Sequence, residues 1–115
     1  IIKLLAVPIF EENVSRFHIY FPDPWPKRRH NPRRLLNEAF FAVLYRALQN
    51  SGSIELATDY ADYYAAIQKT LRNAAIPWRE VKESHSRLFE PDLKTNYELK
   101  YEKEGRELFY LSLRK

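Results

Sequence analysis

Cysteine and methionine are both missing from this chain of 115 residues, and glycine occurs only twice. Without cysteine the chain can hold no disulfide, no thiolate zinc site and no cysteine nucleophile. Two isolated glycines, Gly52 and Gly105, cannot build a GxGxxG turn or a P-loop. The three histidines lack the spacing of metal ligands, so we expect no metal site.

Long hydrophobic runs are missing as well. No apolar run approaches the roughly 20 residues that a membrane-spanning helix requires, and the first residues lack the architecture of a signal peptide. We therefore expect a cytoplasmic protein with no membrane partner. Because the chain opens with Ile1 and has no methionine, we also expect it to be part of a larger protein. Its 45% hydrophobic content is that of a globular domain, and its length allows at most one.

One stretch, residues 17–34, concentrates the distinctive features of the sequence. Its apolar start, Phe17–Phe21, predicts a buried strand. Asp23 follows between two prolines that forbid regular structure, and Trp25 comes soon after. Asp23 is either a turn former or a carboxylate that faces a ligand, and the second interpretation is favoured. Trp25 is equally suited to be a core residue or a stacking surface for a ring.

Positive charge gathers at the end of this stretch. The whole chain carries a net charge of +4, yet the eight residues 27–34 hold five cations and no acid. A localised basic patch is typical of a surface that binds nucleic acid or another polyanion. A solvated charged face is the alternative, and we favour phosphate binding. The cations are Lys27, Arg28, Arg29, Arg33 and Arg34.

The hydrophobic pattern alternates between strands and helices, which indicates an α/β fold with a mostly parallel sheet. Asn31 and Pro32 are expected to open the first full helix, as its cap and its first residue. Gly52 is expected to end that helix in the left-handed conformation. Residues 1–10 are expected to hold the end of an earlier helix. The expected strands are residues 17–21, 53–57, 78–83 and 107–114, and the expected helices are residues 31–50, 60–74 and 95–103.

Two acids follow the first two predicted strands. Asp23 comes after residues 17–21, and Asp59 comes after residues 53–57. Because ligands of parallel α/β sheets bind at the carboxyl ends of the strands, we expect both carboxylates at one edge of the sheet, next to a ligand. Asp59 is equally suited to cap the helix that follows it.

Thr95 and Glu98 have the spacing of a capping box, in which each side chain bonds the backbone amide of the other residue. On the residue types alone, capping is the favoured interpretation of both. The alternation of Tyr97, Leu99 and Tyr101 leaves a strand as the rival to a helix in this segment.

The block FPDPWPKRRH at residues 21–30, followed by Arg33, resembles the signature of the bacterial tRNA (guanine-N7)-methyltransferases. Thr58-Asp59 and the TNYE block at residues 95–98 resemble later signatures of that family, in the same order. The resemblance covers nearly the whole chain. It implies a Rossmann-like, class I methyltransferase fold with an antiparallel last strand. It also implies that the protein uses S-adenosylmethionine to methylate N7 of a guanine in the tRNA variable loop.

The resemblance implies that Asp23 is catalytic and that Asp23, Thr95 and Glu98 line the pocket of the cofactor and the target base. For Thr95 and Glu98 this reverses the preference for capping. It implies that tRNA is the partner and that S-adenosylmethionine is the cofactor, with no metal. A homodimer is the assembly to be tested. The residues implied in substrate binding are Lys27, Arg28, His30, Arg33, Asp59, Thr95 and Glu98.

The glycine-rich strand–turn–helix that opens members of this family has no counterpart in the sequence. We therefore expect residues 1–115 to be the C-terminal part of a single methyltransferase domain. The alternative function is a truncated, non-catalytic fragment that binds tRNA. Methylation of adenine amino groups in DNA is a third interpretation, but it predicts a DPPY-type motif that this sequence does not match.

Overall fold

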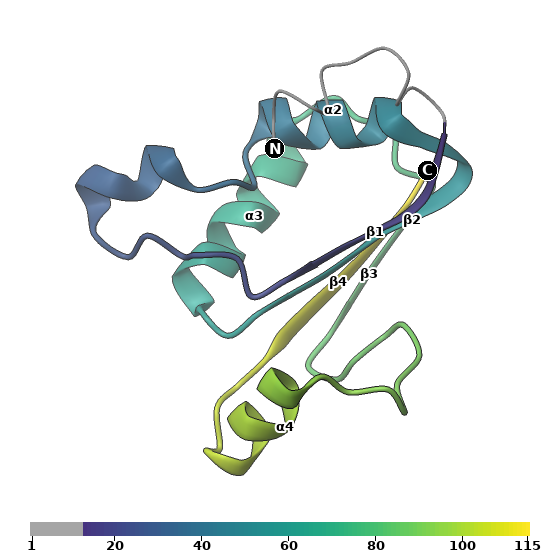
Figure 1. Ribbon diagram of the computed structural model, residues 1–115. Coiled ribbons are helices and arrows are strands. Elements are labelled where there is room, and N and C mark those ends of the chain that lie inside the picture. Colours follow the sequence, from purple (N-terminus) through teal and green to yellow (C-terminus); the bar gives the residue numbers. More distant parts are fainter. Residues whose placement is uncertain (1–12) are drawn as a thin grey trace.

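A computed structural model describes residues 13–115, which form a four-stranded sheet with helices on both sides (Figure 1). The strand order is β1-β2-β4-β3; β1 and β2 are parallel, and β4 runs antiparallel to both of its neighbours. The predicted sheet, mostly parallel with an antiparallel last strand, is confirmed. The expected helix within residues 1–10 lies outside the described residues. The strands are β1 (Val14–Tyr20), β2 (Leu48–Thr58), β3 (Glu80–Ser84) and β4 (Phe109–Arg114).

Two helices, α2 (Glu38–Ala47) and α3 (Ala61–Asn73), lie on one side of the sheet, and α4 (Asn96–Lys103) lies on the other (Figure 1). The prediction of helices at 60–74 and 95–103 is confirmed, and the rival strand at residues 97–101 is wrong. Within residues 13–115 no helix has the length and apolar character needed to cross a membrane.

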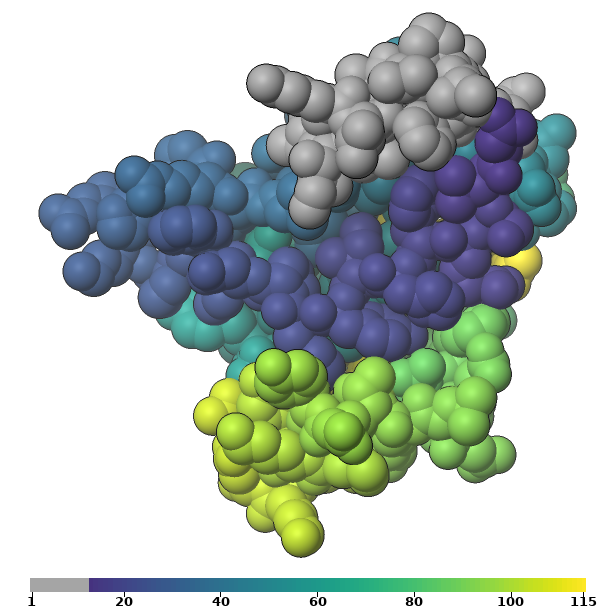
Figure 2. All heavy atoms as spheres, viewed as in Figure 1, coloured from purple at the N-terminus to yellow at the C-terminus, as the bar shows by residue number. Residues whose placement is uncertain are grey.

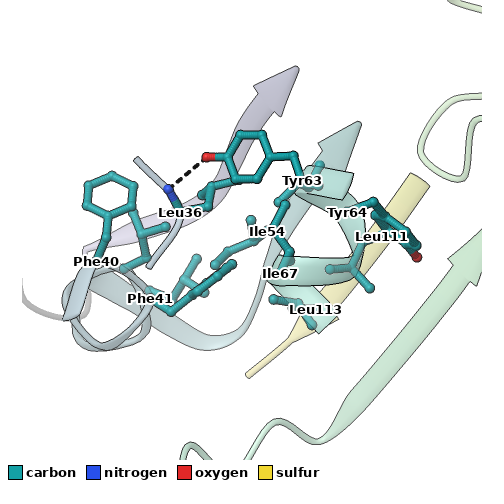
Figure 3. Close-up of a cluster of buried hydrophobic side chains, with 12 residues drawn as sticks. Leu36, Phe40, Phe41, Ile54, Tyr63, Tyr64, Ile67, Leu111 and Leu113 are labelled. Carbon is teal, nitrogen blue, oxygen red and sulfur yellow. Dashed lines mark hydrogen bonds between the residues drawn. The ribbon is translucent and has the colours of Figure 1, made fainter. Parts of the chain in front are cut away.

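The main core lies between the sheet and helices α2 and α3 (Figure 3). Tyr63 is fully buried there, and its hydroxyl accepts a hydrogen bond of 3.0 Å from the backbone amide of Leu36. This bond satisfies a polar group that would otherwise be costly to bury. It also joins α3 to the segment that precedes α2. The apolar side chains packed around it include Phe41, Leu44, Ile54, Leu56, Ile67, Leu111 and Leu113.

The predicted start of the first full helix is wrong. Asn31 and Pro32 lie inside a short 3₁₀ helix, η2 (Arg28–Arg33), and α2 begins only after Asn37. The Asn37 side chain accepts a 2.9 Å hydrogen bond from the amide of Phe40, so Asn37 is the N-cap. The sequence offers two asparagines with the same capping signal, and the extended backbone at Arg34 separates η2 from the true helix.

The prediction that Gly52 ends a helix is wrong, because Gly52 lies inside strand β2. A Cβ atom at this position would meet the carbonyl oxygen of Gln49 at 2.9 Å and that of Ser15 at 3.0 Å. Glycine is therefore required here by the close approach of neighbouring backbone and not by a left-handed turn. Ser51 instead adopts the positive φ, 67°.

Candidate functional site at the carboxyl edge of the sheet

The carboxyl ends of β1 and β2 lie side by side. Tyr20 pairs with Ala57 in the parallel ladder, and the amide of Phe21 donates a 2.8 Å hydrogen bond to the carbonyl of Ala57. Asp23 and Asp59, which follow these two strands, therefore emerge at the same edge of the sheet. The predicted placement of both acids at one edge is confirmed by this register.

Asp23 shapes the turn that follows β1 and is exposed to solvent. Its Oδ1 accepts a 3.0 Å hydrogen bond from the amide of Trp25, so the side chain does shape the turn. The residue is also exposed, and no cation of residues 13–115 forms an ion pair with it. One carboxylate oxygen thus organises the loop while the group as a whole remains open to a ligand.

The backbone around Asp23 is strained. Phe21 has a φ of 53° and Trp25 a φ of 42°, both in the left-handed region that side-chain-bearing residues rarely adopt. Each such residue costs on the order of 1–3 kcal/mol, and such residues gather at functional sites. Asp23 therefore lies in a loop whose shape the surrounding structure enforces.

Asp59 binds an arginine that the sequence did not single out. Its Oδ2 lies 2.6 Å from Nη1 of Arg106, and this hydrogen bond is the main cause that raises the pKa of the guanidinium. The guanidinium of Arg106 also covers the ring of Tyr101 at 4.5 Å. The interpretation of Asp59 as a helix cap is wrong, because the N-cap of α3 is Tyr60.

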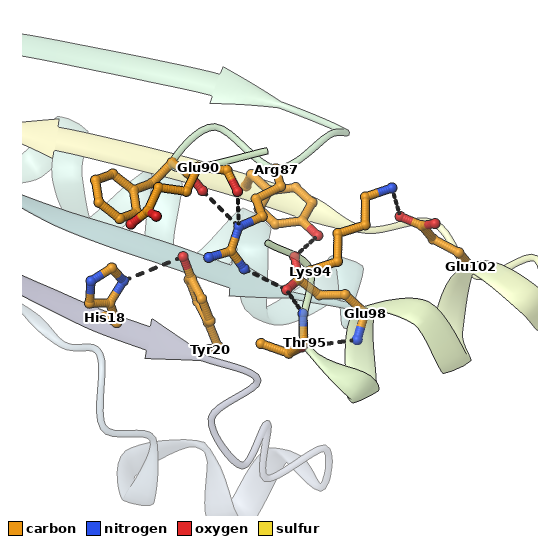
Figure 4. A network of polar contacts seen from close by, with 10 residues as sticks. His18, Tyr20, Arg87, Glu90, Lys94, Thr95, Glu98 and Glu102 are labelled. Carbon is orange, nitrogen blue, oxygen red and sulfur yellow. Dashed lines mark hydrogen bonds and ion pairs between the residues drawn. The ribbon is translucent and has the colours of Figure 1, made fainter. Parts of the chain in front are cut away.

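Thr95 and Glu98 form the capping box that the spacing predicted (Figure 4). The Thr95 amide donates to Oε1 of Glu98 at 2.7 Å, and the Glu98 amide donates to the Thr95 hydroxyl at 3.1 Å. Glu98 is fully buried and binds two further groups, Nη1 of Arg87 and the hydroxyl of Tyr110, each at 2.6 Å. Both oxygens of the Glu98 carboxylate are thus occupied by the protein itself.

Glu98 remains ionised in this buried position. Burial by itself would raise the pKa of its carboxyl group, but hydrogen bonds from Thr95 and Tyr110 and the charge of Arg87 together hold that pKa below its ordinary value. The pKa of the Tyr110 hydroxyl is correspondingly raised, first by burial and then by its bond to Glu98. The guanidinium of Arg87 also lies 5.2 Å from the ring of Tyr20, at the end of β1.

Four of the five cations at residues 27–34 are exposed, so the basic surface is smaller than the sequence suggests. Element η2 has no buried residue and projects to the side of the sheet in Figure 1. His30 meets the ring of Trp25 edge-on at 5.8 Å, and Arg33 lies over that ring at 5.3 Å. The exposed cations are Lys27, Arg28, Arg29 and Arg33.

Arg34 does not belong to this exposed surface, contrary to the sequence-based expectation. It is only 7% exposed, donates to the carbonyl of Pro24 at 2.7 Å and pairs with Asp62 at 2.8 Å. Its guanidinium also lies 4.8 Å from the ring of Tyr63. Arg34 therefore holds the proline-rich loop against α3.

The comparisons with known proteins agree with this architecture. Residues 1–111 match the family model Methyltransf_4, whose description is "Putative methyltransferase". The chain belongs to this family. It is 40% identical over 95 residues to a tRNA (guanine-N(7)-)-methyltransferase of Thermus thermophilus, with 80% of this chain and 28% of the relative covered. A protein of the same name from Acidithiobacillus ferrooxidans is 39% identical over 99 residues, with 84% and 43% covered. The chain thus spans less than half the length of these relatives.

Two solved structures share the fold. A Thermus thermophilus protein titled a "putative DNA modification methylase" superposes with a TM-score of 0.56 at 18% identity, with 98% of this chain and 49% of that chain covered. A SAM-dependent O-methyltransferase of Thermotoga maritima gives a TM-score of 0.50 at 15% identity, with 91% and 34% covered. The predicted Rossmann-like methyltransferase fold is confirmed.

Proposed function

We propose that this chain acts within a tRNA (guanine-N7)-methyltransferase, which transfers a methyl group from S-adenosylmethionine to N7 of a guanine in the tRNA variable loop. The observation that carries the proposal is the exposed Asp23 carboxylate at the carboxyl edge, directly followed by the exposed cations of η2. The relatives that match along this segment carry the name of that activity.

The reaction needs positioning more than proton transfer. The N7 lone pair of guanine is already nucleophilic, so no base has to remove a proton before attack. Orientation of the reacting groups can supply about 7–11 kcal/mol of the barrier reduction. Asp23 supplies the electrostatic part, because its carboxylate accepts the N1–H and N2–H groups of guanine and offsets the positive charge that develops in the ring. Asp59 lies at the same edge, where its Oδ2 is paired with Arg106 and the net charge of the pair is zero.

The residues present fit the methyl-transfer end of the cofactor. When bound, S-adenosylmethionine would supply an electrophilic methyl group on a positively charged sulfur, and Thr95 and Glu98 at the start of α4 would line that end of the cofactor. The Thr95 hydroxyl accepts from the Glu98 amide, and a hydrogen bond from the same side chain helps to lower the pKa of the Glu98 carboxyl group. Glu98 contributes to this pocket by fixing Thr95, since its own carboxylate is buried and occupied.

The exposed side chains of η2 bind the tRNA. Lys27, Arg28 and Arg33 contact phosphates, which gives affinity that depends on salt and not on base sequence. His30 assists by bracing the Trp25 ring on which Arg33 lies. We further propose that residues 1–115 are the C-terminal part of a single methyltransferase domain in a cytoplasmic enzyme, and that a homodimer is its assembly.

Substitution of Asp23 tests the catalytic proposal. In the full-length enzyme, Asp23→Asn should lower turnover by about 10²–10³-fold, the loss typical of one electrostatic contact to the reacting group. The affinity for tRNA should stay within about twofold, because the cations are unchanged. Asp92→Asn, at another exposed acid, is the matched control and should leave both quantities unchanged. Near-normal turnover of Asp23→Asn would remove Asp23 from the catalytic step.

The rival function, a fragment that binds tRNA without methylating it, is separated by one assay. The chain is mixed with tRNA and S-adenosylmethionine labelled in its methyl group. Label in the tRNA supports the enzyme, whereas tRNA retained on the protein without label supports binding alone.

A further inference from the structure

Tyr97 stands apart from every other large aromatic side chain that the structure describes. It is 62% exposed, and it is the only Phe, Tyr or Trp among residues 13–115 that belongs to the exposed class. Trp25, the other candidate for a stacking surface, already packs against His30 and Arg33. The most exposed aromatic side chain among residues 13–115 is therefore Tyr97 and not the tryptophan of the motif.

The ring of Tyr97 belongs to an aromatic cluster at the carboxyl edge. Its centroid lies 6.4 Å from that of Phe21 and 6.1 Å from that of Tyr101, and these two rings meet edge-on at 5.1 Å. Phe21 is only two residues before Asp23. In Figure 2 the yellow-green segment of α4 lies against the purple-blue segment at the end of β1. Tyr97 is thus placed beside the proposed catalytic loop.

Hydrogen bonds hold the backbone that carries Tyr97 and Phe21. The capping box at Thr95 and Glu98 fixes the first turn of α4, in which Tyr97 lies. The hydrogen bond from the Phe21 amide to Ala57 and the left-handed backbone of Phe21 set the position of its ring. A ring held in this way loses little conformational freedom when another flat ring stacks on it.

We propose that Tyr97 is a stacking platform for one unpaired base of the tRNA. This base is either the one that is methylated or a base next to it. The inference rests on the proposed function, since it takes tRNA as the substrate. Bases in RNA that are recognised singly are splayed from their helix and stacked on aromatic side chains. The exposed cations of η2, which follow Asp23 in the chain, supply the phosphate contacts that bring such a strand to this edge.

A protein partner fits this surface less well than a base. The large apolar side chains of the loop before α4 and of α4 that are exposed are Leu93, Tyr97 and Leu99. A stable protein interface buries about 800 Å² on each partner, which takes roughly 20–30 residues. A single exposed aromatic face matches the size of one nucleobase.

The test compares Tyr97→Ala, Tyr97→Phe and Leu99→Ala in the full-length enzyme, with tRNA binding measured between low and moderate salt. Leu99 is the matched control, because it is exposed on the same helix. Tyr97→Ala should weaken tRNA binding about tenfold, in the range of one lost base stack. The slope of affinity against salt should not change, since no cation is lost. Tyr97→Phe and Leu99→Ala should bind as the unaltered enzyme does.

Two results would overturn the inference: tRNA affinity of Tyr97→Ala within twofold of the unaltered enzyme, or an effect confined to the affinity for S-adenosylmethionine. The second result would assign the ring to the adenine of the cofactor. Failure of the proposed function is seen separately, as an unaltered enzyme that binds tRNA but does not methylate guanine. The affinity comparison between variants remains valid in that case.

Discussion

Two charged regions of this protein use their charge in opposite ways. The cations Arg28, Arg29 and Arg33 of η2 and Lys27 at its N-cap are exposed, and η2 has no buried residue. On the other side of the sheet, Glu98 and Arg87 have side-chain exposures of 0% and 7% and are bonded to each other. The charges of the first region are accessible to a ligand, whereas those of the second are buried and paired with each other. Charge density along the sequence does not distinguish these two cases; burial does.

The largest expected effect comes from breaking the buried pair. Arg87→Ala leaves the Glu98 carboxylate buried and uncompensated, which should lower the free energy of unfolding by about 3–5 kcal/mol. Urea unfolding of the full-length enzyme measures this change. Arg106→Ala is the control, because that arginine pairs with Asp59 at the same distance of 2.6 Å but is 47% exposed. Its cost should be clearly smaller, because solvent screens the attraction in an exposed pair. Equal costs for the two variants would contradict the contrast between the regions.

Neighbouring arginines provide a sharper comparison of the same kind. Arg34→Ala removes hydrogen bonds to Pro24 and Asp62 and should cost about 2–3 kcal/mol of stability, without changing the salt dependence of tRNA binding. Arg33→Ala should change stability by less than about 0.5 kcal/mol. It should lower the slope of log affinity against log salt by about one. The distinction between the two arginines would be wrong if both variants lowered the stability equally, or if both lowered the salt dependence of tRNA binding.

The smallest expected effect is a change in pH dependence. A carboxyl group whose pKa is lowered on folding stabilises the protein above its ordinary pKa of 4.5, and this stabilisation is lost as the pH falls through the lowered value. Thermal unfolding of the full-length enzyme should therefore show that stability falls as the pH drops below about 4.5. In the Glu98→Gln variant this fall should be smaller. Glu90→Gln, at an exposed position, should keep the full loss. Parallel profiles for the two variants would mean that Glu98 is not responsible.

Much of the fold was predictable because it follows from local pattern. The short apolar run at residues 17–21, the helical spacing of residues 60–74 and the capping box at residues 95–98 each correspond to an observed element. The errors arose where a local signal has two solutions. Asn31 and Asn37 both suit a cap, and Gly52 suits either a helix end or a crowded strand.

The candidate site was predictable only in part. The shared edge of Asp23 and Asp59 follows from strand order, which the sequence indicates. The partners Arg106 and Arg87 do not, since each pairs with its acid through loop geometry that no spacing rule describes. Arg106 is separated by 47 residues from Asp59 along the chain. The catalytic role of Asp23 stays a prediction. So do the ligand-binding roles of Lys27, Arg28, His30, Arg33, Asp59, Thr95 and Glu98.

The position of β4 has a consequence for the order in which the protein folds. Within the described residues, β3 pairs only with β4, and β4 alone connects β3 to β2. During synthesis, β1 and β2 can pair early, but β3 has no partner until Phe109–Arg114 has left the ribosome. The loop that carries Arg87 and the helix that carries Glu98 both lie between β3 and β4. Docking of the last strand, with Tyr110 on it, is therefore the step that assembles the buried network and completes this edge of the sheet.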